Sequence, residues 1–498
     1  MAANDALVQP NEQTKVEFGD AQFSNEDGVK VSPNAATTLF LDSEKLEYYR
    51  NEKKYRLIRW ALFAAFWLIW VALIGSAIAI IVFSPRKKDD SKSGTTNTYE
   101  VFLPSLSDGP NGFERLKGQL HPLADLGVNT LLISPVFKYN SNAADNTDVE
   151  DYILNDSLGT KEELRDLIQA VHDAKMKIIA DVPLKLISPR KSKNLDGFVK
   201  RTKDGDVLDL GNTKARNYLL NGIAETLLDI DGVSFDGAYI HEPSDSDVKI
   251  DGYNDFLAEA KEHTKDEEKV FPSNFIFIVA ADYEKGKNIN AKAIYDRITA
   301  TSAKNAIEKL VEAASRVIDG NTTFTPVLSS ADVPRFAKNF NNENLLKLVN
   351  GLRLFAFPHS HILYGEEYGE TCNDVPSLCK YPNLDYHSLA HNATIPAFGD
   401  GLRESARKIA VLHPTLISNS SIILKNSITR ESIDGHHYSF VFNEGNTTKS
   451  IIYKDIVPAQ FTGNLKNVGI DGLESDYSEK SENFGPYEYK VLKFLKVD

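Results

Sequence analysis

Cysteine is scarce in this chain of 498 residues, which contains only Cys372 and Cys379. A structural zinc site usually takes four cysteine or histidine ligands, so two cysteines cannot build one by themselves. Positive charge is also in deficit, because 56 lysines and arginines face 70 aspartates and glutamates, for a net charge of −14. Such a balance disfavours contacts with nucleic-acid phosphates. We therefore expect no nucleic-acid partner, no metal site and no cofactor.

Tryptophan is rare too, and all three residues, Trp60, Trp67 and Trp70, lie in one uncharged stretch. Residues 60–83 read WALFAAFWLIWVALIGSAIAIIVF. A helix of this length is about 36 Å long, enough to cross a hydrocarbon core of about 30 Å. The stretch is too long and too uniformly apolar for a core helix, and it starts too late for a cleaved signal peptide. The sequence predicts a single transmembrane helix at residues 60–83.

The flanks of this helix indicate its orientation. Six lysines and arginines precede it between residues 45 and 59, and four follow it between residues 86 and 92, which favours a cytosolic N-terminus. Five Asn-x-Ser/Thr acceptors for glycosylation follow the helix and none precedes it. They begin at Asn155, Asn321, Asn392, Asn419 and Asn446. We therefore predict a type II protein, with its bulk outside the cell.

Small residues recur along the predicted transmembrane helix. Ala61, Ala65, Ala72, Gly75 and Ala79 follow one another at steps of four, seven, three and four. A face of small residues lets a second membrane helix approach closely. We predict a helix contact through Ala65, Ala72, Gly75 and Ala79, although small residues are common in membrane helices in any case.

The rest of the chain divides by composition. Residues 1–59 are expected to form a cytosolic segment that is largely disordered, since residues 1–40 are polar without periodicity. Residues 84–98 are expected to be a polar linker. Short apolar runs then alternate with helical patterns over residues 99–414, and alternating strands with short turns fill residues 415–498.

Eight of the short runs are expected to be strands. They cover residues 99–104, 130–136, 177–182, 232–237, 275–280, 293–299, 323–330 and 352–358. Helical patterns at residues 159–175, 213–230 and 303–318 lie between them. This alternation predicts an α/β fold, a parallel (β/α)8 TIM barrel, followed by a C-terminal antiparallel β-sandwich domain.

Five ordered segments of the barrel region resemble the alpha-amylase family of glycoside hydrolases. They are GVNTLLISPVF (127–137), DY with GTKEELRDLIQAVHDAKMKIIADV (151–182), GVSFDG (232–237), SSADVPRF (329–336) and FPHSHILYGEEYG (357–369). That family uses two carboxylates, a nucleophile and a general acid. Its nucleophile pattern, Gly-x-Arg-x-Asp, would place Asp236 at the nucleophile and Ser234 at the arginine. Alanine stands where the acid after the fifth strand would be.

Two further segments depart from the family's pattern. The usual Asn-His-Asp of the seventh strand is Ser-Ala-Asp here, ending at Asp332. The third strand keeps Asp181 but has Lys185 and Leu186 near the usual Asn-His. General acid catalysis contributes about 10²–10⁴-fold, so its loss alone is severe. The resemblance therefore implies no catalytic residue, with Asp181, Asp236 and Asp332 as relics or as satisfied polar groups at the barrel rim.

An anchor joined to a stripped amylase-like domain resembles the heavy subunits of heteromeric amino-acid transporters, the cell-surface antigen heavy chain and rBAT family. The resemblance implies a non-catalytic ancillary subunit that escorts a twelve-helix light subunit to the plasma membrane and stabilises it there. The family's cysteine just beyond the transmembrane helix is missing, so association is expected to be non-covalent. We expect Cys372 and Cys379 to pair with each other, which would contribute about 2.5 kcal/mol.

Two other functions remain open on the sequence. One is a membrane-anchored alpha-glucosidase-like hydrolase with unusual catalytic residues, in which Asp282 or Glu284 would replace the missing acid. The other is a surface adhesion or receptor protein without a transporter partner.

Overall fold

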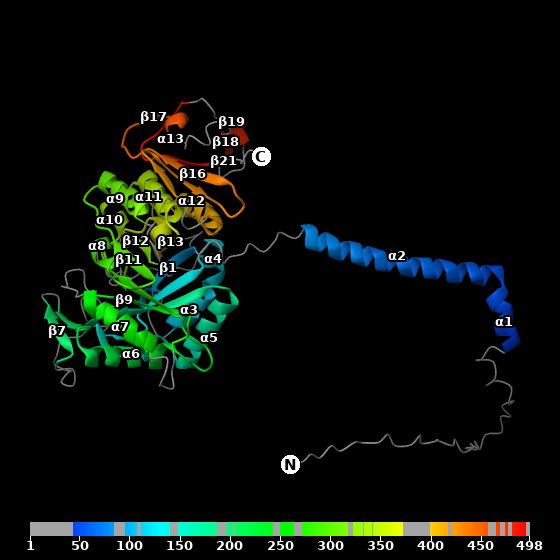
Figure 1. Ribbon diagram of the computed structural model, residues 1–498, viewed down its shortest axis with the longest axis horizontal. Coiled ribbons are helices and arrows are strands. Elements are labelled where there is room, and N and C mark those ends of the chain that lie inside the picture. The colour runs from blue at the N-terminus through cyan, green and yellow to red at the C-terminus, as the bar shows by residue number, and fades with distance from the viewer. Residues whose placement is uncertain are drawn as a thin grey trace, which may run out of the picture. The chain divides into compact units, whose positions relative to one another are not determined.

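The computed structural model describes much of the chain in two compact units, Met1–Arg86 and Lys87–Asp498 (Figure 1). The described residues are 43–83, 95–106, 111–139, 148–186, 197–202, 205–242, 250–262, 271–316, 322–331, 333–340, 342–371, 399–416, 421–456, 465–468, 474–476 and 481–494. The predictions of a disordered N-terminus and of a polar linker fall mostly outside these residues.

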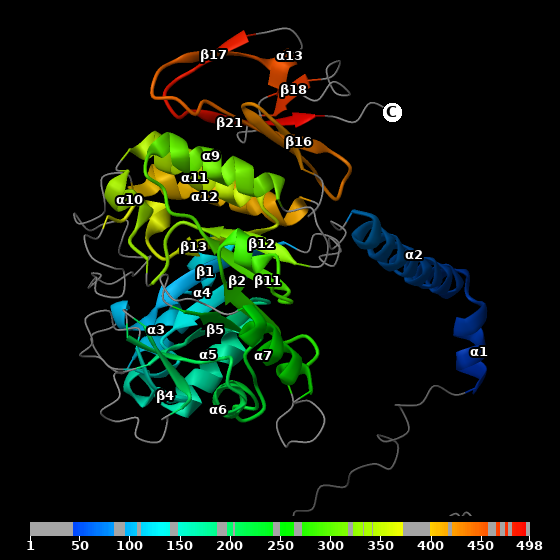
Figure 2. The same cartoon turned by 60° about the vertical axis from the view of Figure 1, so that its left-hand side comes forward.

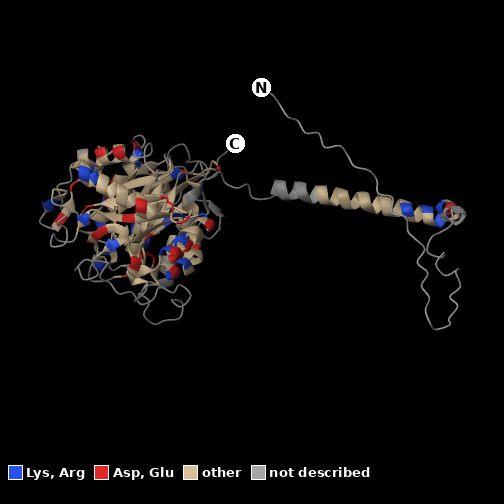
Figure 3. Cartoon of the chain, turned by 90° about the horizontal axis from the view of Figure 1, so that it is seen from below, with Lys and Arg blue, Asp and Glu red and all other residues tan. Residues whose placement is uncertain are grey.

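The N-terminal unit consists of two helices, α1 (Ser43–Asn51) and α2 (Lys53–Phe83), separated by Glu52. Helix α2 contains the predicted transmembrane stretch but begins seven residues before it. Its first turns carry lysines and arginines, and an uncharged stretch follows (Figure 3). Among the described helices, α2 alone is long and apolar enough to cross a membrane.

The C-terminal unit is built on eight parallel strands in the order β12-β11-β10-β9-β5-β2-β1-β13. Strands β12 and β13, at the two ends of this order, also contact each other, so the sheet closes into a (β/α)8 barrel. The strands are β1 (Thr96–Phe102), β2 (Thr130–Ser134), β5 (Lys177–Pro183), β9 (Gly237–His241), β10 (Ile276–Ala280), β11 (Ala293–Arg297), β12 (Thr323–Val327) and β13 (His359–Leu363). The predicted fold class is confirmed, and the first strand begins three residues before the predicted start at residue 99.

Two of the eight strands lie elsewhere than predicted. The fourth, β9, begins at Gly237, where residues 232–237 were expected to form a strand. Residues 229–233 instead form a tight turn, closed by a bridge between Ile230 and Val233, with Gly232 at a φ of 93°. The eighth prediction, residues 352–358, falls mainly in helix α11 (Glu343–Ala356), and β13 follows it. The prediction was wrong because this run is buried on all sides, as a core strand would be.

Helices surround the barrel, as Figure 2 shows, and they contribute buried apolar residues to its core. They are α3 (Gly112–Gly118), α4 (Leu120–Asp125), α5 (Lys161–Asp173), α6 (Thr213–Leu227), α7 (Ile250–Glu262), α8 (Tyr283–Gly286), α9 (Ala303–Ser315), α10 (Phe336–Asn339), α11 and α12 (Gly399–Leu412). Helix α5 begins at a capping box, in which Thr160 and Glu163 satisfy each other's backbone amides. Its apolar stripe, from Leu164 to Val171, is fully buried against the barrel.

Three smaller sheets are described beside the barrel. A five-stranded sheet beside the barrel has the order β3-β4-β6-β8-β7, from β3 (Phe137–Tyr139), β4 (Val149–Leu154), β6 (Lys185–Leu186), β8 (Gly205–Leu208) and β7 (Val199–Thr202). The C-terminal sheet is antiparallel in the order β14-β15-β16-β21-β18-β19, with a separate pair β17-β20. These strands are β14 (Ile422–Leu424), β15 (Ser427–Glu431), β16 (His437–Phe442), β17 (Lys449–Ile452), β18 (Leu465–Val468), β19 (Glu474–Asp476), β20 (Ser481–Phe484) and β21 (Tyr489–Phe494); helix α13 (Tyr453–Ile456) follows β17.

The C-terminal sheet packs on α11 through both apolar and polar contacts. The Phe440 ring lies 5.5 Å from that of Phe355. Arg430, which is fully buried, donates from Nη1 to the carbonyl oxygens of Phe355 and Phe357 at 2.9 and 3.3 Å. His413 Nε2 lies 2.7 Å from the same Phe357 oxygen, so it carries a proton. These bonds join the sheet to the helix end that precedes β13.

His413 should make the C-terminal unit sensitive to acid. Burial, together with nearby Arg430, lowers the pKa of His413 to about 3, and its Nδ1 is buried without a hydrogen bond. The unfolded chain binds this proton below about pH 6.5 and the folded chain does not, so stability falls as the pH drops from 6.5 towards 3. The expected slope is about 1.4 kcal/mol per pH unit for this one group. Urea unfolding at several pH values measures it.

The variant His413→Gln is the matched test. Its amide nitrogen can donate to Phe357, but it cannot titrate. We expect the acid slope between pH 6.5 and 4 to shrink by about one proton. An unchanged slope would assign the acid sensitivity to other groups, such as His359, whose pKa is lowered by burial to about 4.

Candidate functional site at the mouth of the barrel

The mouth of the barrel, where the carboxyl ends of the strands meet, is where this fold places its active sites. Side chains alternate along a strand, so Asp181 on β5, His241 on β9 and Arg297 on β11 all face the barrel axis. Asp181 and His241 are each 6% exposed. The predicted relic Asp181 therefore lies in the expected place, beside two residues that sequence analysis did not single out.

These three side chains form a row in which the histidine lies in the middle. His241 Nε2 lies 2.9 Å from Asp181 Oδ1, and Arg297 Nη2 lies 3.3 Å from His241 Nδ1. A guanidinium can only donate, so Nδ1 accepts and Nε2 carries the ring proton towards Asp181. Both ring nitrogens are thus engaged. The histidine therefore lies between two charged side chains of the barrel itself.

Asp236 does not belong to the mouth, which corrects the prediction that it is the relic nucleophile. It precedes β9, at the opposite end of the barrel. Its Oδ2 accepts a hydrogen bond from the Ile178 amide at 2.8 Å and lies 3.0 Å from His172 Nε2. Asp236 therefore joins helix α5 to the start of strands β5 and β9. Because β9 begins later than predicted, its carboxyl end carries His241 instead.

Tyrosines fill the barrel just below the mouth. The Tyr239 ring stacks on the His241 ring at 5.2 Å and lies 5.0 Å from Tyr295. The Tyr295 hydroxyl donates to Thr98 Oγ1 at 3.0 Å, and burial raises the pKa of Tyr295 well above its ordinary value. The buried apolar residues of this interior are Leu132, Ile179, Tyr239, Ile278, Ala280, Tyr295 and Val327.

The candidate replacement acids lie away from the barrel axis. Asp282 follows β10 but caps helix α8, where its Oδ1 accepts from the Lys285 amide at 2.9 Å. Glu284 is paired with Lys287 on the exposed side of the same helix. Burial raises the pKa of Asp296 to about 6, as a catalytic acid would need, but Asp296 alternates with the inward residues of β11 and faces the helices.

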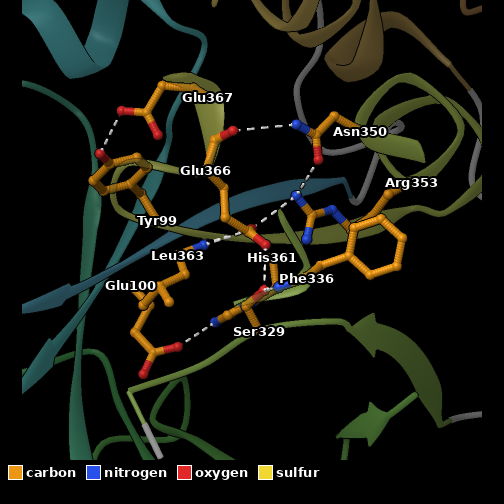
Figure 4. Close-up of polar contacts among 10 residues, drawn as sticks. All are labelled: Tyr99, Glu100, Ser329, Phe336, Asn350, Arg353, His361, Leu363, Glu366 and Glu367. Carbon is orange, nitrogen blue, oxygen red and sulfur yellow. Dashed lines mark hydrogen bonds and ion pairs between the residues drawn. The ribbon is translucent and has the colours of Figure 1, made fainter. Parts of the chain in front are cut away.

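Glu100 is a carboxylate inside the barrel, and Figure 4 shows its side chain among the buried polar residues of this region. Oε2 lies 2.7 Å from His361 Nε2, and Oε1 accepts from the Ala331 amide at 2.8 Å. Glu100 and His361 are 3% and 1% exposed. This buried pair joins β1 to β13 and to the segment after β12, so it holds the barrel together rather than facing a substrate.

A second buried carboxylate, Glu366, lies behind the mouth in the short helix that follows β13 (Figure 4). Its Oε2 lies 3.0 Å from Arg353 Nη2 and accepts from the Leu363 amide, while Oε1 accepts from Ser329 Oγ. Burial disfavours its charge, but Arg353 and these hydrogen bonds outweigh burial and lower the pKa of Glu366. Glu366 therefore stays ionised, as a structural anchor.

A hollow of about 280 Å³, counting space open to solvent, lies beside Asp181. Its lining is mostly apolar, with Ser134 and Asp181 as polar members. The other lining residues are Phe102, Pro135, Val136, Phe137, Tyr139, Val149 and Pro183. Within the described residues, no group of histidine, cysteine, aspartate and glutamate could hold a metal ion.

Several predicted residues lie outside the described ranges: Asp332, Cys372, Cys379, Asn321, Asn392 and Asn419. On α2, Ala65 and Ala72 are exposed, as is the whole described surface of the helix, and Gly75 and Ala79 continue the same helix. The predicted helix contact through these four small residues therefore stays a prediction.

The two described glycosylation acceptors differ in burial. Asn446 lies on an exposed turn. Asn155 is 2% exposed, its Oδ1 accepts from the Ser157 amide at 3.1 Å, and its Nδ2 is buried. A glycan on Nδ2 does not fit this fold, so the structure argues against the Asn155 prediction. The local reason is that Asn155 caps the turn at Asp156–Leu158.

We expect Asn446→Gln to remove one glycan and Asn155→Gln to remove none when the full-length chain is made in a eukaryotic secretory pathway. Gel mobility with and without glycosidase, followed by glycopeptide mass spectrometry, measures both. An occupied Asn155 would show that its side chain leaves the buried cap, which would contradict the capped turn at Asp156–Leu158.

Comparison with known proteins adds to this geometry. Residues 27–99 match the family model described as solute carrier family 3 member 2 N-terminus, and residues 102–198 match that of the alpha amylase catalytic domain. The mouse amino acid transporter heavy chain SLC3A2 is 26% identical over 187 residues, which span 36% of this chain and 34% of the relative. Over these residues the chain is similar to the amino acid transporter heavy chains. The mouse heavy chain SLC3A1 is 32% identical over 150 residues, 28% of this chain and 21% of that protein.

The fold is shared with solved amylases. The structure of a maltogenic alpha-amylase, AmyB, from Thermotoga neapolitana aligns with this chain at 16% identity and a TM-score of 0.61. The alignment covers 82% of this chain and 100% of the amylase. An alpha-amylase from Geobacillus thermoleovorans aligns at 15% identity and a TM-score of 0.59, over 81% of this chain and 99% of that amylase. Likeness at this identity concerns the fold alone. The matches to the curated heavy chains span about a third of their length or less.

Proposed function

We propose that the chain is a non-catalytic ancillary subunit that escorts and stabilises an amino-acid transporter light subunit at the plasma membrane. The observation that carries the proposal is the match of residues 27–99 to a heavy-chain N-terminus, joined to a barrel mouth occupied by its own side chains. A light subunit of twelve helices and a type II orientation, with the N-terminus in the cytosol, are part of the proposal.

The absence of catalysis is inferred from how the mouth is filled. Asp181 faces a histidine at 2.9 Å, where a retaining hydrolase would have a second carboxylate about 5 Å away. The candidate acids Asp282 and Glu284 are engaged on helix α8. The barrel is proposed to serve as a rigid domain whose surface, rather than whose mouth, carries the function.

Co-expression tests the escort function. The full-length chain, produced with a candidate light subunit in cells that lack heavy chains, should raise both the surface amount of the light subunit and the uptake of labelled amino acid. A chain in which residues 60–83 are exchanged for an unrelated transmembrane helix is the matched control. If no candidate light subunit gains surface amount or uptake, the proposal fails.

The association is proposed to be non-covalent and to use the small-residue face of α2. Changing Ala65, Ala72, Gly75 and Ala79 to leucine would widen this face, so recovery of the light subunit in mild detergent should fall several-fold. Ala77→Leu is the matched control, because residues two positions apart on a helix are turned by about 200°. Equal recovery from both variants would reduce α2 to an anchor.

Further parts of the proposal concern the whole chain. We infer a cytosolic segment at residues 1–59, a linker that ends where β1 begins at Thr96 rather than at residue 98, an amylase-like barrel up to residue 414 and a separate β domain from 415. We also infer a disulfide between Cys372 and Cys379. Peptide mapping without reduction should find these two cysteines in one linked pair.

Two alternatives remain as outcomes of these tests. The amylase-like fold would also suit a membrane-anchored glycosidase, which would release sugar from maltose and lose that activity on Asp181→Asn. An adhesion or receptor protein would reach the surface alone and would cross-link to no transporter.

A further inference from the structure

The segment before the apolar part of α2 concentrates positive charge. Its cationic residues, here called the basic collar, are Arg50, Lys53, Lys54, Arg56 and Arg59. All five are exposed. Glu47 and Glu52 are the carboxylates of residues 47–59, so this short segment has a net charge of three positive in a chain whose net charge is −14.

The collar is bent rather than straight. The helix breaks at Glu52, and Figure 1 shows α1 turned away from the axis of α2. Arg59 spans the break, because its Nη2 donates to the Arg50 carbonyl oxygen at 2.5 Å and its Nε donates to that of Tyr55 at 3.4 Å. If α2 crosses a membrane, the end of α1 and the first turns of α2 therefore lie together at the membrane surface.

Three tyrosines accompany these cations. The ring of Tyr49 lies edge-to-face with those of Tyr48 and Tyr55, at 5.6 and 5.2 Å. Tyr48 is 65% exposed, Tyr49 42% and Tyr55 38%. Exposed tyrosine, with its apolar ring and polar hydroxyl, is typical of the layer between lipid headgroups and hydrocarbon. The collar thus combines positive charge with the aromatic residues of a membrane interface.

Within the described part of the chain, the charged groups of Arg50, Lys53, Lys54 and Arg56 have no carboxylate at ion-pair distance. All four side chains are exposed, so an anion from outside the described residues can reach them. Membrane lipids supply such anions at this depth, and juxtamembrane clusters of lysine and arginine are attracted to them.

We propose that the basic collar binds the headgroups of anionic phospholipids of the phosphatidylserine class. The tyrosines lie at the glycerol level, and the cations of the collar contact phosphate and carboxylate groups. This inference goes beyond the escort function and needs no light subunit. With the proposed type II orientation, the lipid belongs to the cytosolic leaflet.

Tryptophan fluorescence of the full-length chain can test the proposal without a label. All three tryptophans, Trp60, Trp67 and Trp70, lie on α2 just beyond the collar. In vesicles, quenching by dibrominated phosphatidylserine is compared with quenching by dibrominated phosphatidylcholine at equal mole fraction. We expect phosphatidylserine to be preferred by about threefold or more at low salt. The preference should largely vanish at 1 M salt, where charges are screened within about 3 Å.

Three variants make the test specific. In the collar variant Arg50, Lys53, Lys54 and Arg56 become glutamine, while Arg59 is kept because it bridges the helix break. In the charge-matched control four exposed lysines of the C-terminal unit become glutamine: Lys214, Lys287, Lys292 and Lys304. A third variant, R50K with R56K, keeps the charge and guards against a local folding defect.

The preference should be lost in the collar variant and kept in the other two. No preference in the wild-type chain, or its survival in the collar variant, would overturn the proposal. Its loss in the charge-matched control would also overturn it, since net charge and not the collar would then attract the lipid. If the collar instead binds an acidic segment of a partner protein, the wild-type chain should show no preference for phosphatidylserine.

Discussion

Replacing Arg353 by alanine is expected to lower the free energy of unfolding of the C-terminal unit by about 3–5 kcal/mol. The Arg353 side chain is fully buried on α11, and its Nη2 lies 3.0 Å from Glu366 Oε2. Without it, the buried Glu366 carboxylate keeps its hydrogen bonds to Ser329 and Leu363 but loses its counter-charge. Denaturant unfolding of the full-length chain in detergent, followed by tyrosine fluorescence or circular dichroism, measures the effect.

The matched control lies on the exposed side of the same helix. Lys347 Nζ lies 2.6 Å from Glu343 Oε1, and the Lys347 side chain is 27% exposed and that of Glu343 39%. An exposed pair of this kind is worth less than about 1 kcal/mol, so Lys347→Ala should change stability little. Similar losses for Arg353→Ala and Lys347→Ala would mean that the Arg353–Glu366 pair does not support the barrel.

The second large effect is expected in catalysis. The purified full-length chain should release no glucose from maltose or from short α-glucans above the buffer blank. The reason lies in the mouth of the barrel, where Asp181 contacts His241, which in turn contacts Arg297, while the candidate acids Asp282 and Glu284 are engaged on helix α8. Because an acid alone contributes about 10²–10⁴-fold, a rate far below that of an amylase is expected even if sugar binds. Product analysis by chromatography over many hours measures this.

The variant Asp181→Asn separates true activity from contamination. Among the described residues, it removes the carboxylate at the mouth that matches the family's pattern, and it should leave the rate at the level of the blank. Sugar release by the wild-type chain that Asp181→Asn abolishes would make the protein a hydrolase and would defeat the non-catalytic account.

Much of the barrel could be predicted from local patterns. Apolar runs such as residues 130–136 and 177–182 became β2 and β5, and the stripe of α5 is buried as its period requires. The failures have physical causes. The run at 352–358 is buried from all sides within α11, and neither length nor period separates such a helix from a core strand. At residues 232–237 the Asp-Gly pair at 231–232 is a turn signal, and it outweighs the strand-like residues around it.

The site was harder to predict than the fold. Asp181 lies where its strand predicted, but the shift of β9 replaces Asp236 by His241 at the mouth. Sequence could not reveal the partner Arg297, which is 56 residues away along the chain and meets His241 only when β9, β10 and β11 align in the barrel. Likewise, the contact of Glu100 with His361 needs the closure of β1 on β13.

The central claim is that this chain is the ancillary partner of an amino-acid transporter. Cross-linking and quantitative mass spectrometry of the chain in its native membranes test this most directly. We predict near-stoichiometric recovery of one multi-helix amino-acid transporter, with cross-links to the C-terminal unit, and its release in denaturing detergent without reduction. Recovery of the chain alone, or only with proteins that are not transporters, would contradict the claim.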